Sequence, residues 1–206
     1  MDKVDIEIIN SFLSGDEESF DLLVKRWEKP LYIFIYRYTK NREDTLEILQ
    51  ETFASVYKNL KNLRNKNLFS AWIYKIALNY CRMFSRREKV SERSDPLEDN
   101  EGNVRKERDY FGKSESALRP DEILEREEIE KVINRALDRL PYLQREVIIL
   151  KEFSGLKFVE IAKILGIPVS TAKSRMYLGL KNLKREVEKI LKFEGNILKG
   201  SEKNEK

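Results

Sequence analysis

The sequence predicts an all-α protein made of two helical modules joined by a flexible acidic linker. Apolar residues recur at helical spacing through most of residues 20–88 and 121–190, and no alternating strand pattern of useful length appears. From about Glu88 to Pro120 the periodicity stops, and turn-forming Ser, Gly, Asp and Pro accumulate. We therefore expect a first module at 1–88, a linker at 89–120, a second module at 121–192 and a basic, disordered tail at 193–206.

The first module is expected to contain several amphipathic helices. Phe20, Leu23, Val24 and Trp27 form one apolar stripe. Pro30 is expected in the first turn of a separate helix that covers Leu31 to Tyr38. A further helix is predicted to begin at Asn41-Arg-Glu-Asp, and its apolar side consists of Leu46, Leu49, Phe53, Val56 and Leu60. After a polar loop at 64–67, the last helix of the module is predicted from Phe69 to about Arg87. Its apolar side consists of Trp72, Ile73, Ile76, Tyr80 and Phe84.

The second module ends in a helix-turn-helix pattern. Helices are predicted at 129–140, which ends at Leu140-Pro141, and at 144–153. In the run 158–177, Gly166 can take the left-handed position after a helix, and Pro168 cannot continue that helix. The second helix of such a unit commonly lies in a DNA major groove. An ordinary helical corner is the alternative, but hydroxyl and cationic side chains at the start of the second helix favour DNA binding.

Composition restricts the class of protein. The chain has no histidine and one cysteine, which excludes an internal disulfide and a cysteine-based zinc site. We expect no catalytic residue, no metal site and no cofactor. The longest apolar run, 31–36, is too short to span a bilayer, and the first residues do not resemble a signal peptide. We therefore expect a cytoplasmic protein without direct membrane insertion.

The charge is unevenly distributed along the chain. The net charge is +4, but residues 91–128 hold 7 basic and 13 acidic side chains, whereas residues 169–206 hold 10 basic and 5 acidic ones. Positively charged ends on either side of an acidic middle suit two nucleic-acid-facing modules joined by a segment that avoids DNA.

Two parts of the chain together resemble a known family. Asp44–Phe53 followed by Phe69–Asn79 resembles the first conserved region of bacterial RNA polymerase sigma factors of the extracytoplasmic-function group. Leu140–Val147 with the helix-turn-helix resembles the other conserved region of that group, in the same order and spacing. The resemblance implies a specificity subunit that directs core polymerase to promoters by binding the −35 duplex and capturing a melted −10 strand.

The resemblance also implies a surface that binds the polymerase. Glu47, Gln50 and Glu51 share one helix face at i, i+3 and i+4. They match the family's docking surface for the clamp helices of the largest subunit, and the flap of the second-largest subunit is the expected partner of the second module. A plain solvated surface is the alternative. The implied core-polymerase-binding residues are Asp44, Glu47, Ile48, Gln50 and Glu51.

DNA-binding residues follow from the same resemblance. The residues implied for the −10 element are Leu63, Arg64, Trp72, Lys75, Asn79, Arg82 and Arg86. Asn79 is at the position where the family contacts a flipped base, and we expect Trp72 to lie mostly in the core. Those implied for the −35 element are Ser170, Thr171, Lys173, Ser174, Arg175 and Tyr177, with Ser170 and Thr171 expected to hold phosphate and cap the helix. The chain departs from the family at Leu178, Gly179 and Leu180, where basic residues are common. The resemblance further implies an anti-sigma factor as partner.

Two other functions fit parts of the sequence. A stand-alone helix-turn-helix regulator, binding duplex DNA as a dimer, would leave the acidic face at 47–51 and the basic helix at 72–87 without a role. A carboxylate-metal nuclease would use Glu43, Asp44 and Glu47 for Mg²⁺, but no second acidic cluster is spaced to complete its site.

Overall fold

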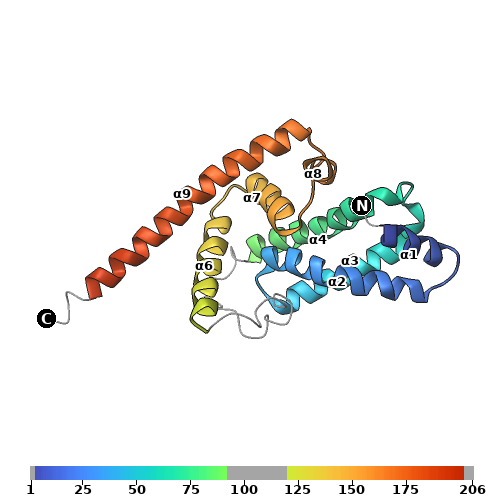
Figure 1. The fold of residues 1–206 in the computed structure, drawn as a ribbon, viewed down its shortest axis with the longest axis horizontal. Helices are drawn as coiled ribbons and strands as arrows, with labels where there is room; N and C mark the ends of the chain where they lie inside the picture. Colours follow the sequence, from blue (N-terminus) through green and yellow to red (C-terminus); the bar gives the residue numbers. More distant parts are fainter. Residues whose placement is uncertain (1–2, 92–119, 202–206) are drawn as a thin grey trace.

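The two predicted helical modules are present in the structure, a computed structural model that describes residues 3–91 and 120–201 (Figure 1). The first module consists of α1 (Lys3–Leu13), α2 (Glu18–Thr39), α3 (Arg42–Asn59), two 3₁₀ turns η1 (Leu60–Asn62) and η2 (Lys66–Leu68), and α4 (Phe69–Ser91). The second consists of α6 (Pro120–Asp138), α7 (Tyr142–Ile148), the π-helical turn η5 (Ile149–Phe153), α8 (Phe158–Leu165) and α9 (Val169–Ser201). These ranges contain no strand, which confirms the all-α prediction.

Helices α2, α3 and α4 form the centre of the first module. Leu31, Phe34 and Ile35 of α2 are fully buried, as are Val56 of α3 and Ile73 of α4. Edge-on aromatic contacts join α2 to α4, with ring centroids 5.6 Å apart for Trp27 and Phe69 and 5.1 Å apart for Phe34 and Tyr74. The predicted start of α3 is confirmed, because the Asn41 side chain accepts hydrogen bonds from the backbone N–H groups of Glu43 and Asp44.

Two features of the first module differ from expectation. Pro30 does not begin a new helix but lies inside the continuous helix α2. Pro30 is exposed, and buried apolar side chains such as Leu23 and Leu31 hold both halves of the helix against the core. Helix α1, which had not been expected, docks through Ile9 and through Asp5, which accepts a hydrogen bond from Arg26 at 2.8 Å.

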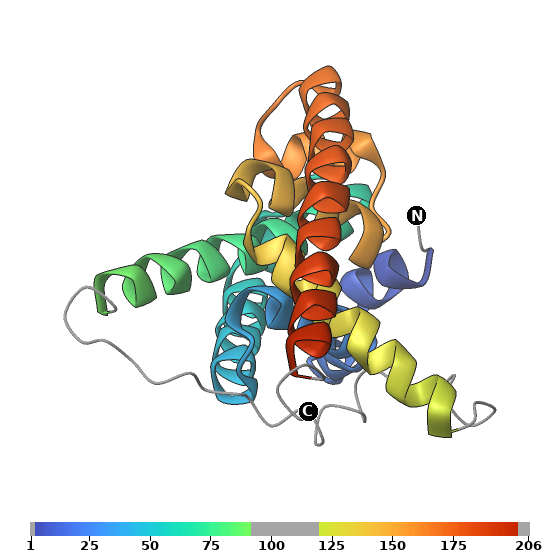
Figure 2. The ribbon, with the colours of Figure 1, turned by 90° about the vertical axis from the view of Figure 1, so that its left-hand side faces the viewer.

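The helix-turn-helix pattern is confirmed as α8, a tight turn and α9. Gly166 has φ 66° and caps α8, and the backbone N–H of Ile167 donates to the carbonyl of Ala162 at 3.0 Å. Ile161 and Ile164 are buried beneath the unit. Helix α9 then continues to Ser201, past residue 192 where we expected the second module to end, and extends away from the body of the molecule (Figures 1 and 2).

The two modules pack directly against each other. Helices α7 and α8 lie beside α4, and the turn η5 contacts α2 (Figure 1). One cluster of buried apolar side chains runs through both modules and includes Leu78 and Cys81 of α4 together with Val147 and Ile161 of the second module. This contact was not predicted, because the sequence pattern indicated only two helical units joined by a linker. Most of the predicted linker, residues 92–119, lies outside the described residues.

A glycine allows α9 to approach α7 closely. A Cβ atom added at Gly179 would lie 2.9 Å from Cδ1 of Ile148 and 3.3 Å from Cβ of Gln144. Ile148 is almost fully buried and cannot withdraw freely. The departure from the family pattern at this position therefore has a packing cause: the helix pair needs a residue without a side chain here.

We predict that Gly179→Val lowers the free energy of unfolding by about 1–3 kcal/mol, because the added methyl groups overpack the α7–α9 contact. Leu178→Val is the matched control, since Leu178 is exposed on the same helix. Urea denaturation of both variants measures the effect. Equal stability of the two variants would contradict the close contact.

Candidate nucleic-acid interface

The start of α9 presents the residues expected to read duplex DNA. Lys173, Ser174 and Tyr177 are exposed, with Tyr177 at 74% of its full exposure. Arg175 is half-buried and lines a cavity between the modules. Ser170 and Thr171 lie within the first turn of the helix, and the carbonyl of Pro168, before the helix, accepts from the N–H of Ala172 at 3.1 Å. This turn gathers hydroxyl and cationic groups where backbone N–H groups are free to bind phosphate.

Helix α4 presents a second set of polar groups. Lys75, Asn79 and Arg86 are exposed along the helix, while Arg64 is exposed and Leu63 half-buried in the preceding loop. Trp72 is half-buried against the core, with its ring 6.1 Å from that of Phe69. Helix α4 therefore carries cations, an amide and a half-buried aromatic ring.

Arg82, also predicted for the −10 set, is already engaged by the second module. Its Nε and Nη2 donate to the two carboxylate oxygens of Glu146 at 2.7 and 2.8 Å. The Glu146 side chain is only 3% exposed, whereas that of Arg82 is 34% exposed. The hydrogen bonds to Glu146 raise the pKa of Arg82 above its usual range. This bidentate, largely buried ion pair joins α4 to α7.

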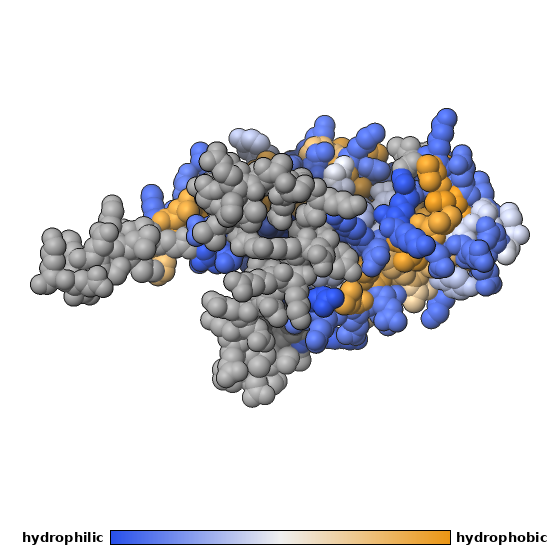
Figure 3. Space-filling model, turned by 60° about the horizontal axis from the view of Figure 1, so that its bottom comes forward, coloured by the Kyte–Doolittle hydropathy of each residue, from blue (hydrophilic) through white to orange (hydrophobic). Residues whose placement is uncertain are grey.

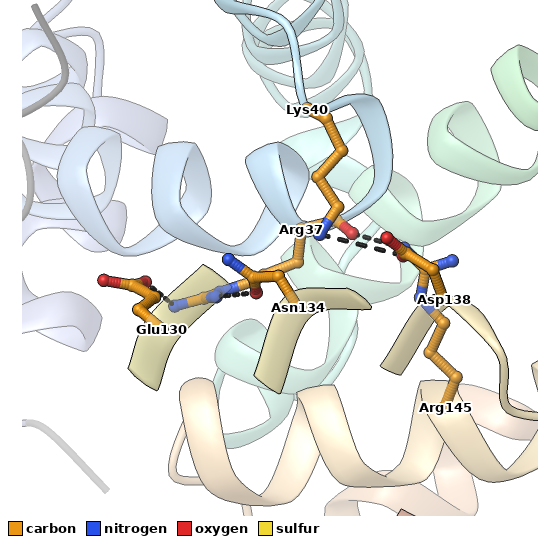
Figure 4. A network of polar contacts seen from close by, with 6 residues as sticks. All are labelled: Arg37, Lys40, Glu130, Asn134, Asp138 and Arg145. Carbon is orange, nitrogen blue, oxygen red and sulfur yellow. Dashed lines mark hydrogen bonds and ion pairs between the residues drawn. The ribbon is translucent and has the colours of Figure 1, made fainter. Parts of the chain in front are cut away.

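A second polar network joins α2 to α6 and α7 (Figure 4). Arg37, with a 6% exposed side chain, donates to Glu130 at 2.9 Å and also to Asn134. Its guanidinium lies 4.1 Å from the ring centre of Phe153 in η5. Asp138 of α6 pairs with Arg145 at 3.0 Å and with Lys40 at 3.7 Å. A buried arginine with this many partners fixes the relative position of the modules.

The acidic face of α3, which we define as Glu47, Gln50 and Glu51, is exposed. Asp44 is half-buried beside it, and burial together with the charges of Glu47 and Glu43 raises the pKa of Asp44. Ile48 was predicted for the same surface but is 6% exposed and belongs to the core cluster. Its side chain therefore packs into the core beneath the acidic face and is not part of the exposed surface.

An apolar patch lies on the first-module side of the face shown in Figure 3. Exposed large apolar side chains of this module include Leu13, Leu22 and Tyr57. Tyr57 packs edge-on against Phe12 and Phe20, with ring centroids 5.3 and 5.0 Å away. It follows Gln50 by seven residues on α3, so it extends the acidic face by two helical turns. Sequence reasoning missed Tyr57, although its helical spacing from Gln50 was the available signal.

The sequence also missed the residues that hold the modules together. Arg37 bonds to Asn134 and Arg145, which lie 97 and 108 residues further along the chain. Arg82 bonds to Glu146, 64 residues further along, so no spacing rule relates these partners. Glu146 lies in the motif Leu140–Val147, but its burial and its partner were not deducible from the motif.

Both modules match families of known proteins. Residues 23–90 match the family model for sigma-70 region 2, and residues 130–183 match that for sigma-70 region 4. The RNA polymerase sigma-H factor of Pseudomonas aeruginosa is 26% identical over 194 residues, which cover 91% of this chain and 96% of that protein. The ECF RNA polymerase sigma-E factor of Escherichia coli is 26% identical over 185 residues, covering 90% and 95%.

Solved structures share the fold. A structure of CnrH in complex with the cytosolic domain of CnrY superposes with a TM-score of 0.63 at 21% identity and covers 90% of this chain and 98% of that one. The sigma factor RpoE of Bartonella quintana, solved in complex with the anti-sigma factor NepR, gives a TM-score of 0.61 at 20% identity, covering 83% and 98%.

The fold consists of two helical modules, with an exposed acidic face on α3 of the first and a helix-turn-helix in the second. With the two region matches covering more than half of its length, the chain belongs to the sigma-70 family of RNA polymerase sigma factors, in its extracytoplasmic-function type. The family predicted from the sequence is confirmed.

Two structural observations bear on a metal-dependent nuclease and on membrane insertion. Among residues 3–91 and 120–201, no three histidine, cysteine, aspartate or glutamate side chains gather in a way that would hold a metal ion. Within the same ranges no helix has both the length and the apolar character needed to cross a membrane.

We predict that Glu146→Gln lowers the free energy of unfolding by about 1.5–3 kcal/mol, because it removes one charge from a buried, hydrogen-bonded pair. The matched control is Glu152→Gln, an exposed residue of the following turn, which should change stability by less than about 0.5 kcal/mol. Adding Arg82→Ala to each variant completes a double-mutant cycle. Additive effects of Arg82→Ala and Glu146→Gln would show that the pair contributes nothing.

The free energy of unfolding should also depend on pH through Lys40, which lies at the contact between the modules. Burial lowers the pKa of Lys40 from 10.5 to about 8, and the charge of Asp138 opposes this shift. Between these pH values the unfolded chain binds the proton and the folded protein does not, so the contribution of Lys40 to the free energy of unfolding rises with pH. Burial raises the pKa of Cys81 and of Tyr38, whose contributions change in the opposite direction.

The measurable quantity is therefore the difference in unfolding free energy between the wild type and Lys40→Met from pH 7 to pH 9.5. We expect the wild type to gain stability relative to the variant as the pH rises. Lys58→Met, at an exposed position of α3, should show no such trend. Parallel curves for the wild type and Lys40→Met would contradict the lowered pKa.

Proposed function

We propose that the chain is a sigma factor that brings core RNA polymerase to specific promoters and starts transcription there. The observation that carries this proposal is the pair of matches to regions 2 and 4 in one chain, with curated sigma factors aligned over 90% or more of its length. A stand-alone helix-turn-helix regulator needs only residues 158–190 and leaves the region 2 match without a function.

In this mechanism the helix α9 reads the −35 element as duplex. Lys173, Ser174 and Tyr177 are exposed, and Arg175, half-buried on the wall of the cavity between the modules, would join them once the modules separate. Arginine and lysine suit the O6 and N7 acceptors of guanine in the major groove, while Ser170 and Thr171 suit phosphate oxygens.

The −10 element would be captured by α4 and the loop before it. Asn79, Arg64, Lys75 and Arg86 are all exposed. Asn79 would hydrogen-bond an unstacked base, and the three cations would neutralise phosphates of a single strand. Arg82 can join them only after it leaves Glu146. The protein itself performs no bond chemistry in this scheme; the free energy of binding the single strand stabilises the open promoter.

Polymerase would bind through the acidic face of α3, with Tyr57 as an apolar extension, and through the second module. Carboxylates suit the basic clamp helices expected as the partner. An anti-sigma factor is a further proposed partner, supported by the shared fold with a sigma factor that was solved with its anti-sigma factor. Such a protein works in the cytoplasm, where promoters and polymerase are found.

The direct test is run-off transcription with purified core polymerase on fragmented genomic DNA. Sequencing the products should reveal a shared −35 and −10 sequence upstream of the start sites. If no start depends on the added protein, it is not a sigma factor for that polymerase.

We predict that Arg175→Ala costs about 1–3 kcal/mol of holoenzyme binding on the preferred −35 sequence and relaxes selectivity there. Lys184→Ala is the charge-matched control, since Lys184 is exposed further along α9. Competition assays on promoters with single −35 changes measure both effects. A uniform loss on every sequence would make Arg175 a phosphate contact.

We predict that Glu47→Ala with Glu51→Ala weakens core-polymerase binding about tenfold or more, through lost charge complementarity. Glu17→Ala with Glu18→Ala removes the same charge from an exposed part of α2 and serves as control. Fluorescence anisotropy of labelled protein titrated with core polymerase gives both affinities. Equal affinities for the two double variants would remove the acidic face from the interface.

A further inference from the structure

A cavity of about 600 Å³ lies between the two modules. Its walls come from α2, α4, α7, the helix-turn-helix and α9, so it exists only while the modules are packed together. Four arginines line it, namely Arg82, Arg86, Arg145 and Arg175, against a single carboxylate, that of Glu146. The cavity is therefore strongly cationic.

Only part of this positive charge is balanced within the described residues. Arg82 is neutralised by Glu146, and Arg145 by Asp138 outside the cavity. Arg86 of α4 and Arg175 of α9 make neither an ion pair nor a hydrogen bond with any residue in the part of the chain that the structure describes. Two guanidinium groups without a partner among these residues, on the walls of one partly enclosed space, attract an anion.

Buried polar atoms in the same walls also lack partners. The hydroxyl of Tyr38 and Nε of Arg145 are both buried without a hydrogen bond. Native proteins rarely leave such groups unsatisfied, and each one calls for a missing partner. Burial raises the pKa of Tyr38 well above 10, so its hydroxyl keeps the proton and remains a donor. Both groups belong to side chains that line the cavity, and a small movement of that wall would let them donate to an acceptor-rich ligand.

The remaining lining is apolar or aromatic. Tyr142 is 63% exposed, and Leu165 and Ile167 come from the helix-turn-helix. A planar ring can stack on a tyrosine and rest on aliphatic side chains. The volume lies within the range of pockets for small molecules and is too small for a DNA duplex.

We propose that this cavity binds a small phosphorylated molecule of the nucleoside diphosphate class. Its phosphates are held by Arg86 and Arg175, which can each form two hydrogen bonds to phosphate oxygens, and its base lies against Tyr142 and Ile167. Because the two arginines belong to different modules, the bound ligand cross-links them. Arg86 and Arg175 line the cavity and also belong to the two proposed DNA surfaces, so the ligand and promoter DNA compete for them. This competition rests on the proposed function, whereas ligand binding itself does not.

Isothermal titration calorimetry on the full chain tests the site, with ADP, pyrophosphate and adenosine as probes. We expect one site for ADP, weaker binding of pyrophosphate and none of adenosine. Arg86→Ala and Arg175→Ala should each reduce the affinity for ADP about tenfold, the effect of losing about 1.4 kcal/mol. Tyr38→Phe, which removes only the orphaned hydroxyl, should reduce it severalfold.

Arg87→Ala is the matched control, because Arg87 is the exposed neighbour of Arg86 on α4 and does not line the cavity. It should leave the affinity for ADP within twofold of the wild type. Absence of ADP binding at millimolar concentration would overturn the proposal. An equal loss in Arg86→Ala and Arg87→Ala would do the same, since it would indicate attraction by net charge alone.

A second measurement separates this inference from the proposed function. ADP at saturating concentration should weaken binding of a labelled promoter fragment to the free protein, and Tyr38→Phe should reduce that inhibition. Tight ADP binding by a protein that recognises no promoter would support the cavity and contradict the sigma-factor role. Normal promoter recognition without ADP binding would contradict the cavity alone.

Discussion

The ion pair between Arg82 and Glu146 connects the fold to the function more directly than any other contact in the molecule. Glu146 is placed by α7 in an almost dry position, where an isolated carboxylate would be very costly. Two charge-assisted hydrogen bonds from Arg82 remove that cost, and they exist only if α4 and α7 are side by side. The apolar core that runs through both modules and the network around Arg37 then have a fixed geometry in which to pack.

This arrangement draws residues that we propose to read DNA into the contact between the modules. Arg82, proposed for the −10 strand, is held by Glu146, and Arg175, proposed for the −35 duplex, lines the cavity between the modules. If the proposed DNA contacts form, binding of polymerase and DNA must supply the free energy that separates the modules. The acidic face of α3 is exposed in the packed form and can therefore bind polymerase first.

The sequence was sufficient for the elements and for their family, and insufficient for their assembly. Helical spacing located α3, α4 and the helix-turn-helix, and Gly166 marked the turn, because these signals are local. Pro30 misled the prediction, since a proline on the exposed side of a helix held by buried neighbours does not end it. Ile48 was assigned to a surface although it packs inward, because a motif match does not distinguish contact residues from the residues beneath them. The partners of Arg37 and Arg82 lie on helices far away along the chain, and only the folded structure brings them together.

We expect the modules to be packed in the free protein and to separate in the holoenzyme, because the proposed DNA contacts of Arg82 and Arg175 require it. Spin labels on cysteines introduced at Lys58 of α3 and Lys184 of α9, both exposed, can report the distance between the modules by pulsed electron paramagnetic resonance. The one native cysteine, Cys81, is buried and does not compete for the label. We predict a single narrow distance distribution in the free protein and a distinctly longer one in the holoenzyme. A broad distribution in the free protein, or an unchanged narrow one in the holoenzyme, would contradict the account.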